Sequence, residues 1–190
     1  MTLKNKILSE LSKRGLDEFI KNEDKTTSEN LFTLSESTVD IINERIADEY
    51  YAHFLYRYAY NWCADANYKK AAKFFLDESN TELEHAKILE KYLTDFNIIP
   101  VTPKIGYTFN INTLPNLIHE GYKTELKLMK EYNECSRKLF NEDLTTFDFL
   151  QQFRIIQKES VIEYNDLING LQLIDSSNKL DVLYFENNYF

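Results

Sequence analysis

The sequence predicts an all-α protein: a four-helix bundle with one long crossover between the second and third helices, followed by a short C-terminal helix. Apolar residues recur at alternating steps of three and four along four long segments, which is typical of helices packed on one face. The 190 residues include only four Gly and three Pro, too few for the tight turns of a sandwich or barrel. The connections between the segments then decide the topology.

The apolar periodicity places the four helices at residues 34–64, 68–95, 114–140 and 146–175. We expect a capping box at Thr33 and Glu36 to open the first helix. Only a few residues, around 65–67 and 141–145, join the first helix to the second and the third to the fourth. Such short links predict antiparallel neighbours.

The stretch between the second and third helices is different, because residues 96–113 contain Pro100, Pro103 and Gly106. In extended form it can reach about 60 Å at roughly 3.3 Å per residue. Each long helix spans roughly 40 Å at about 1.5 Å per residue. The stretch can therefore run the whole length of the bundle, so the second and third helices can be parallel.

The chain is expected to divide into three parts. Residues 1–32 form an N-terminal extension with a possible amphipathic helix and a polar linker, residues 33–175 form the bundle, and residues 176–190 form a tail with a short helix from about residue 181. The amphipathic helix could pack on the outer surface or dock to a partner.

Charge and composition exclude several classes of function. The net charge is −9, from 22 basic and 31 acidic residues, which argues against binding nucleic acid or anionic lipid. No stretch approaches the roughly 20 apolar residues of a membrane span, and the N-terminus lacks the apolar run of a signal peptide. The two cysteines, Cys63 and Cys135, exclude a disulfide framework. We expect a cytoplasmic protein.

Polar residues interrupt the apolar seam of every helix near its middle. They are Glu49 and His53 on the first helix, Glu78, Glu82 and His85 on the second, Glu125 on the third, and Gln157 and Ser160 on the fourth. A carboxylate in a bundle core costs several kcal/mol of desolvation unless a partner compensates it, and no Lys or Arg lies on these seams. A bound divalent metal ion is the simplest source of the missing positive charge. Carboxylates with one imidazole suit iron or manganese better than zinc.

Other interpretations of these residues remain open. The acidic residues would face solvent if the helical phase were shifted by one position. His53 is more readily a packed core histidine than a ligand, and Glu78 more readily a solvated or paired residue than a relay for iron. Tyr56 could hydrogen-bond a ligand, donate an electron or simply fill the core.

At these positions the sequence resembles the non-haem ferritins of bacteria. The matching segments are INERIADEYYAHFLY from Ile42, FFLDESNTELEHAKILEKY from Phe74, GYKTELKLMKEYNE from Gly121, TFDFLQQFRIIQKES from Thr146, and VLYF from Val182, which is similar to the start of their fifth helix. The resemblance implies metal ligands at Glu49, Glu82, His85, Glu125 and Gln157. It also implies a catalytic role for Tyr56 beside them.

Some positions depart from related families. Gln157 and Ser160 replace the second Glu-x-x-His of bacterioferritins, and Leu83 stands where their haem-ligating Met would be, so no haem is expected. A third iron site beside the pair is doubtful because Thr81 and Ile156 fill positions that carry carboxylates in many bacterial ferritins. The N-terminal extension has no counterpart in ordinary ferritins.

The resemblance implies an iron-storage ferroxidase. Two irons per subunit would bind at the site, oxygen or peroxide would oxidise ferrous to ferric iron, and a homo-oligomer, a 24-subunit shell, would store the product. The alternatives are a ferritin-like diiron oxidase that builds no shell and a metal-free structural bundle. A DNA-protecting miniferritin is a weaker third idea, since those proteins place their ligands between subunits.

Overall fold

The computed structural model describes residues 33–104 and 106–190. The described part is all-α, as expected, and has no strand. Its helices are α3 (Glu36–Asp65), α4 (Lys69–Asp95), α5 (Leu114–Glu142), α6 (Leu144–Leu171) and α7 (Lys179–Tyr189). The amphipathic helix and linker expected in residues 1–32 lie outside the described residues, and the division of the chain into three parts stays a prediction.

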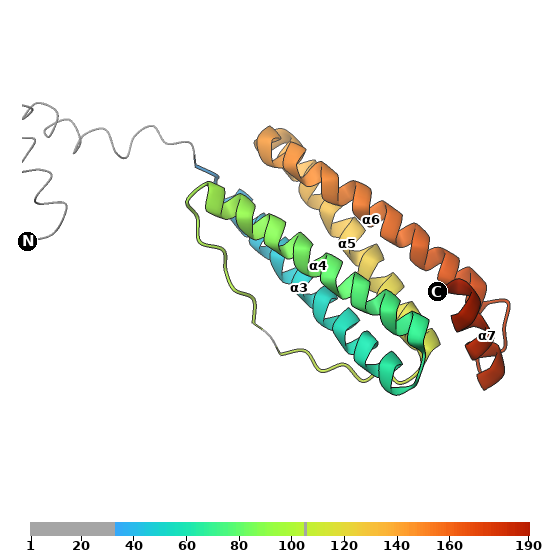
Figure 1. The fold of residues 1–190 in the computed structure, drawn as a ribbon. Coiled ribbons are helices and arrows are strands. Elements are labelled where there is room, and N and C mark those ends of the chain that lie inside the picture. The colour runs from blue at the N-terminus through green and yellow to red at the C-terminus, as the bar shows by residue number, and fades with distance from the viewer. Residues whose placement is uncertain (1–32, 105) are drawn as a thin grey trace, which may run out of the picture. The chain divides into compact units, whose positions relative to one another are not determined.

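The topology of the bundle follows the lengths of its connections. α3 and α4 run antiparallel, as do α5 and α6, and the crossover travels back along the bundle so that α4 and α5 are parallel (Figure 1). The tight turn between α3 and α4 includes Asn67, whose φ of 65° lies in the left-handed region that Asn tolerates better than most residues. None of the described helices is both long and apolar enough to span a membrane.

Two helix boundaries differ from the expected ones. The first helix is capped by Ser35 rather than by a box at Thr33, because the Ser35 hydroxyl accepts a hydrogen bond from the backbone N–H of Thr38 at 3.1 Å. α6 ends at Leu171 rather than near residue 175. Beyond this point the Asp175 carboxylate accepts hydrogen bonds from the backbone N–H and hydroxyl of Ser177, 2.9 and 2.7 Å. This local turn replaces the helical hydrogen bonds.

Two carboxylates organise the helix ends. Asp143 is the single residue between α5 and α6, and its side chain accepts from the backbone N–H of Thr146 at 3.0 Å. Tyr68, the residue directly before α4, provides no side-chain cap. Instead Glu186 of α7 accepts from the backbone N–H groups of Lys70 and Ala71, 2.6 and 3.3 Å away. α7 therefore completes the N-terminus of α4.

Apolar side chains fill both ends of the bundle. One end is a buried cluster from α3 to α7 that includes Phe75, Leu117, Tyr164 and Phe185. Near the other end, the buried side chains include Ile42, Ile46, Leu89, Leu93, Leu139 and Leu150. Between these two apolar regions lies the polar layer that carries the candidate site.

Candidate metal centre

The sequence-predicted polar residues meet inside the bundle. Glu49 and Glu125 have no exposed surface, and Gln157 has none either. Glu82 is 2% exposed and His85 is 6% exposed. The four long helices each contribute at least one of these side chains, so the interpretation in which they face solvent is wrong. Helical spacing explains the arrangement, because each residue occupies the core-facing position of its own helix.

One group of ligand atoms joins α3 and α4. Glu49, Glu82 and His85 offer two carboxylate oxygens and an imidazole nitrogen that lie within 4.8 Å of one another. Nδ1 of His85 lies 2.9 Å from Oε2 of Glu82 and 3.8 Å from Oε2 of Glu49. The Glu-x-x-His spacing puts the two α4 ligands one turn apart on the same face. These three residues could hold one metal ion.

A second group joins α4 and α5. Carboxylate oxygens of Glu78, Glu82 and Glu125 also lie within 4.8 Å of one another. Glu82 belongs to both groups, so its two oxygens can serve two neighbouring cations. Glu78 is half-buried and takes part in the second group. The sequence favoured a solvated or paired role for it, although its position one turn before Glu82 was a usable signal.

Two tyrosines hold the outer carboxylates in a reciprocal arrangement between α3 and α5. Tyr56 of α3 donates a hydrogen bond to Oε1 of Glu125 on α5. Tyr132 of α5 donates one to Oε1 of Glu49 on α3. Both tyrosines are fully buried. Tyr132 follows the core-facing spacing of its helix, but no sequence pattern indicates that its hydroxyl reaches a carboxylate on another helix.

Several buried polar atoms of the site have no hydrogen-bond partner among the described residues. They are Oε2 of Glu49, Oε2 of Glu125, and both Oε1 and Nε2 of Gln157. Leaving a buried polar atom unpaired costs about 1–3 kcal/mol, and more for a charged group. Each tyrosine therefore occupies one oxygen of its glutamate and leaves the other open. Open oxygen donors in a dry interior fit metal ions of the iron and manganese class.

The ionisation of the carboxyl groups reflects their burial. Burial raises the pKa of Glu82 well above its ordinary value, and the charges of Glu49 and Glu125 add to the effect. Burial also raises the pKa of Glu125 to about 8 and that of Glu78 to about 7. Burial acts to raise the pKa of Glu49 too, but interactions with His85 and Glu82 outweigh it and lower that pKa. In the absence of a cation the cluster therefore retains protons.

One buried cation, Arg45, lies close to the site. Arg45 is 5% exposed and lies one turn before Glu49 on α3. Its guanidinium bonds to Asp48 at 2.7 Å and to the sulfur of Cys135 at 3.2 Å, and it lies 5.9 Å from the centre of the Tyr132 ring. Arg45 is thus committed to Asp48 and does not neutralise the carboxylates of the site.

Two further polar seam residues do not join the ligand groups. Nδ1 of His53 lies 2.7 Å from the carbonyl oxygen of Ser79 and 3.0 Å from its hydroxyl, so this half-buried histidine is hydrogen-bonded to α4. The Ser160 hydroxyl donates to the carbonyl of Ile156 on its own helix at 3.3 Å.

The comparison with known proteins agrees with this architecture. Residues 39–174 match the family model described as a ferritin-like domain. The chain belongs to the ferritin family. This ferritin is 29% identical over 154 residues to the bacterial non-heme ferritin of Escherichia coli O157:H7, which covers 80% of this chain and 92% of that one. It is 27% identical over 143 residues to that of Campylobacter jejuni, covering 74% of this chain and 86% of the relative.

The solved structures show the fold. An open-pore ferritin from Archaeoglobus fulgidus superimposes with a TM-score of 0.76 at 20% identity and covers 83% of this chain and 98% of its own. A humanized archaeal ferritin gives a TM-score of 0.76 at 21% identity, over 83% of this chain and 96% of its own. The ferritin-like bundle and the bacterial non-haem type expected from the sequence are thereby confirmed.

Proposed function

We propose that this ferritin stores iron by oxidising Fe(II) at two adjacent positions inside each bundle and passing Fe(III) to a cavity enclosed by many copies of the chain. The observation that carries the proposal is the pair of ligand groups that share Glu82. Ferritin membership and fold support iron storage. The oxidation and the shell are the parts that need testing.

Charge balance supports two ferrous ions per subunit. Glu49, Glu78, Glu82 and Glu125, when ionised, supply a charge of −4, which matches the +4 of two ferrous ions. The protons that the empty cluster retains would leave as the cations bind. His85 would offer Nδ1 as a ligand, which lies 2.9 Å from Oε2 of Glu82.

The remaining residues of the site orient the ligands. Tyr56 and Tyr132 each fix one oxygen of a glutamate, so that the free oxygen is held in place before iron arrives. Gln157 offers a neutral amide oxygen and adds no charge. Two ferrous ions would lose one electron each. With two protons, these electrons reduce one dioxygen to hydrogen peroxide, or one hydrogen peroxide to two waters.

The site assignment is tested by combining Glu82→Ala with His85→Ala. We expect the initial rate of aerobic Fe(II) oxidation to fall by at least about tenfold, because both positions lose a ligand. A matched control is Glu84→Ala with His119→Ala, since both of those side chains are exposed. A double variant at Glu82 and His85 that oxidises Fe(II) at the wild-type rate would show that the assignment is wrong.

The storage function is tested on the wild-type protein by measuring particle mass and iron content after aerobic loading. A very large particle, such as a 24-subunit shell, that retains many more than two irons per chain supports storage. A dimer or monomer with two irons per chain would instead indicate a diiron oxidase, and a protein without metal a structural bundle. The cytoplasmic location and the absence of haem remain expectations from the sequence.

A further inference from the structure

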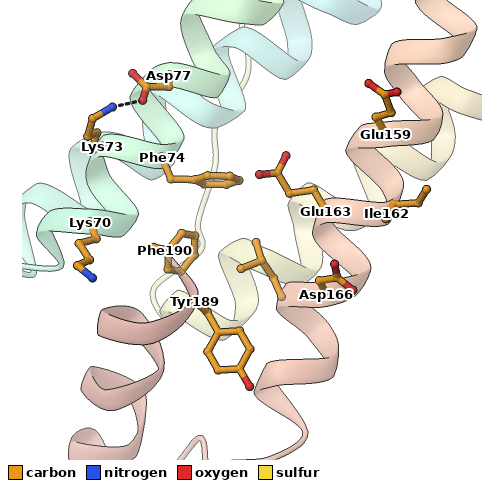
Figure 2. A pocket seen from close by; sticks show the side chains of 11 residues that line it. Lys70, Lys73, Phe74, Asp77, Glu159, Ile162, Glu163, Asp166, Tyr189 and Phe190 are labelled. Carbon is orange, nitrogen blue, oxygen red and sulfur yellow. Dashed lines mark hydrogen bonds and ion pairs between the residues drawn. The ribbon is translucent and has the colours of Figure 1, made fainter.

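Two surface pockets that involve α6 differ in charge. Four carboxylates and two lysines line the pocket between α4 and α6, and one of the carboxylates, Glu163, extends from α6 towards Phe74 of α4 (Figure 2). The pocket between α5 and α6 has a volume of about 480 Å³, which is within the range of ligand pockets. Among the described residues, no carboxylate lines it. Its lining includes Asn133, Ser136, Arg137 and Phe140 of α5 and Phe147 and Arg154 of α6.

Helical spacing and contacts between the two helices shape the α5–α6 pocket. Its α5 residues recur at steps of three and four, so they share one face of that helix. Nε of Arg154 donates to Oδ1 of Asn133 at 3.1 Å, and its Nη1 donates to Oε1 of Gln151 at 2.7 Å. The rings of Phe140 and Phe147 meet edge to face, with their centroids 5.3 Å apart. The pocket therefore combines a guanidinium group held by neutral amides with an aromatic wall.

The two arginines of this pocket form no ion pair with a described carboxylate. Arg154 bonds only to the two amides, and Arg137 is exposed. Nη2 of Arg154 and the guanidinium of Arg137 can therefore donate to a ligand. Lys130 lies two turns before Arg137 on α5, and Lys158 lies one turn after Arg154 on α6. In a chain with a net charge of −9, this local positive charge attracts anions.

A buried hydroxyl in the pocket lacks a partner. Ser136 is 3% exposed and lines the pocket, and its Oγ has no hydrogen-bond partner among the residues that the structure describes. Buried polar atoms are nearly always hydrogen-bonded, so an unpaired one needs an explanation. A serine hydroxyl can donate to an anionic oxygen. A bound anion would thus satisfy Ser136 and the two arginines together.

We propose that the pocket between α5 and α6 binds a phosphate group, held by Arg137 and Arg154 with the hydroxyl of Ser136 as a further donor. Guanidinium groups match the geometry of phosphate oxygens. A phosphate group offers three acceptor oxygens and a charge of about −1.5 to −2 at pH 7, which suits several separate donors. Phe140 and Phe147 leave room for the aromatic part of a phosphate ester. The site shares no residue with the metal ligand groups, so the inference does not depend on the proposed function.

The test is titration calorimetry of the metal-free, full-length protein with inorganic phosphate and with adenosine monophosphate, at constant ionic strength. Arg137→Gln and Arg154→Gln should each weaken binding by about tenfold or more, because each removes a charge-assisted hydrogen bond. Ser136→Ala should weaken it by about fivefold. Arg154→Lys keeps the positive charge and should still weaken binding, because an ammonium group lacks the planar fork of a guanidinium.

The matched control is Arg57→Gln, which removes the same charge from an exposed residue of α3 that does not line this pocket. It should bind both ligands as the wild type does. Thermal unfolding of each variant without ligand identifies any loss of the fold. Arg137→Gln is the variant least exposed to that problem, since its side chain lies at the surface.

The two ligands distinguish the source of the phosphate group. Tighter binding of the nucleotide, lost in the arginine variants, supports an ester whose aromatic part contacts the phenylalanines. Equal affinities, lost in the same variants, support a site for the phosphate group alone. If neither ligand gives saturable binding to the wild type at millimolar concentration, or if Arg57→Gln weakens binding as much as Arg137→Gln does, the site is overturned. Fe(II) oxidation by Arg137→Gln should proceed at the wild-type rate in every case.

Discussion

At the scale of single residues, the tyrosines decide which carboxylate oxygens of the site remain open. Tyr132→Phe removes the hydrogen bond to Oε1 of Glu49 and leaves a second buried oxygen of that residue unpaired. We expect Zn(II) affinity to fall by about 10–100-fold, as for other groups that orient metal ligands. Titration calorimetry measures this.

A matched control for this variant exists on the same helix as Glu49. Tyr50→Phe also removes a tyrosine–glutamate hydrogen bond, to Glu90 at 2.9 Å, but neither residue belongs to the ligand groups. Its Zn(II) affinity should equal that of the wild type. If Tyr132→Phe binds Zn(II) as tightly as Tyr50→Phe does, then Tyr132 only fills space.

The candidate metal ligands could be predicted from the sequence, but the tyrosines that hydrogen-bond to them could not. Each candidate ligand is a polar residue within the apolar repeat of its own helix, and such an interruption can be recognised without knowing the neighbouring helices. The residues are Glu49, Glu82, His85, Glu125 and Gln157. Their common functional role stays a prediction until metal is bound.

Other contacts depend on how two helices are aligned in space. Tyr132 reaches α3 and Glu163 faces α4 only because of the register between helices, which no periodicity specifies. Tyrosines are moreover frequent in apolar cores, so a seam tyrosine carries little information about its hydroxyl.

At the scale of elements, α5 and α6 approach closely at Gly121, one turn before Glu125. A Cβ atom there would lie 2.3 Å from Cε1 of Tyr164, whose ring stacks on Tyr56 at 6.1 Å. Gly121→Ala should therefore destabilise the fold by about 1–3 kcal/mol, despite the better helix propensity of Ala. Urea denaturation checks this.

The control for close packing is Gly106→Ala in the crossover, where a Cβ would meet nothing within 4 Å. This variant should unfold at nearly the wild-type urea concentration. Equal stability of the variants at Gly121 and Gly106 would mean that the Tyr164 ring moves without cost.

The helices themselves were predicted well because their apolar periods are long. Their ends were harder, since Ser35 and Thr33 are both good caps and only the observed hydrogen bond to Thr38 distinguishes them. The parallel direction of α4 and α5 was predictable because the length of the crossover limits what it can span.

At the scale of the whole molecule, the buried carboxyl groups make stability depend on pH. The raised pKa values of Glu125 and Glu78, about 8 and about 7, mean that these groups favour the folded state most while protonated. Their contribution is complete below the unfolded pKa of about 4.3 and is lost as pH rises through 7 to 8. The metal-free protein should therefore lose stability between pH 5 and pH 8.

Thermal unfolding at several pH values measures this loss. Glu78→Gln should lose less stability over that range than the wild type, by on the order of 1–3 kcal/mol, whereas Glu84→Gln, at an exposed position, should follow the wild type. Saturating Zn(II) should remove the loss, because a bound cation favours ionised ligands. A Glu78→Gln profile parallel to the wild type would contradict the raised pKa.

The cap that Glu186 provides for α4 has a consequence for the order in which the chain folds. The backbone N–H of Lys70 is satisfied by a residue 116 positions later. During synthesis on the ribosome, the first turn of α4 must therefore wait without this cap until Glu186 has been translated. The nascent bundle can collapse earlier, but this closing contact must wait for α7.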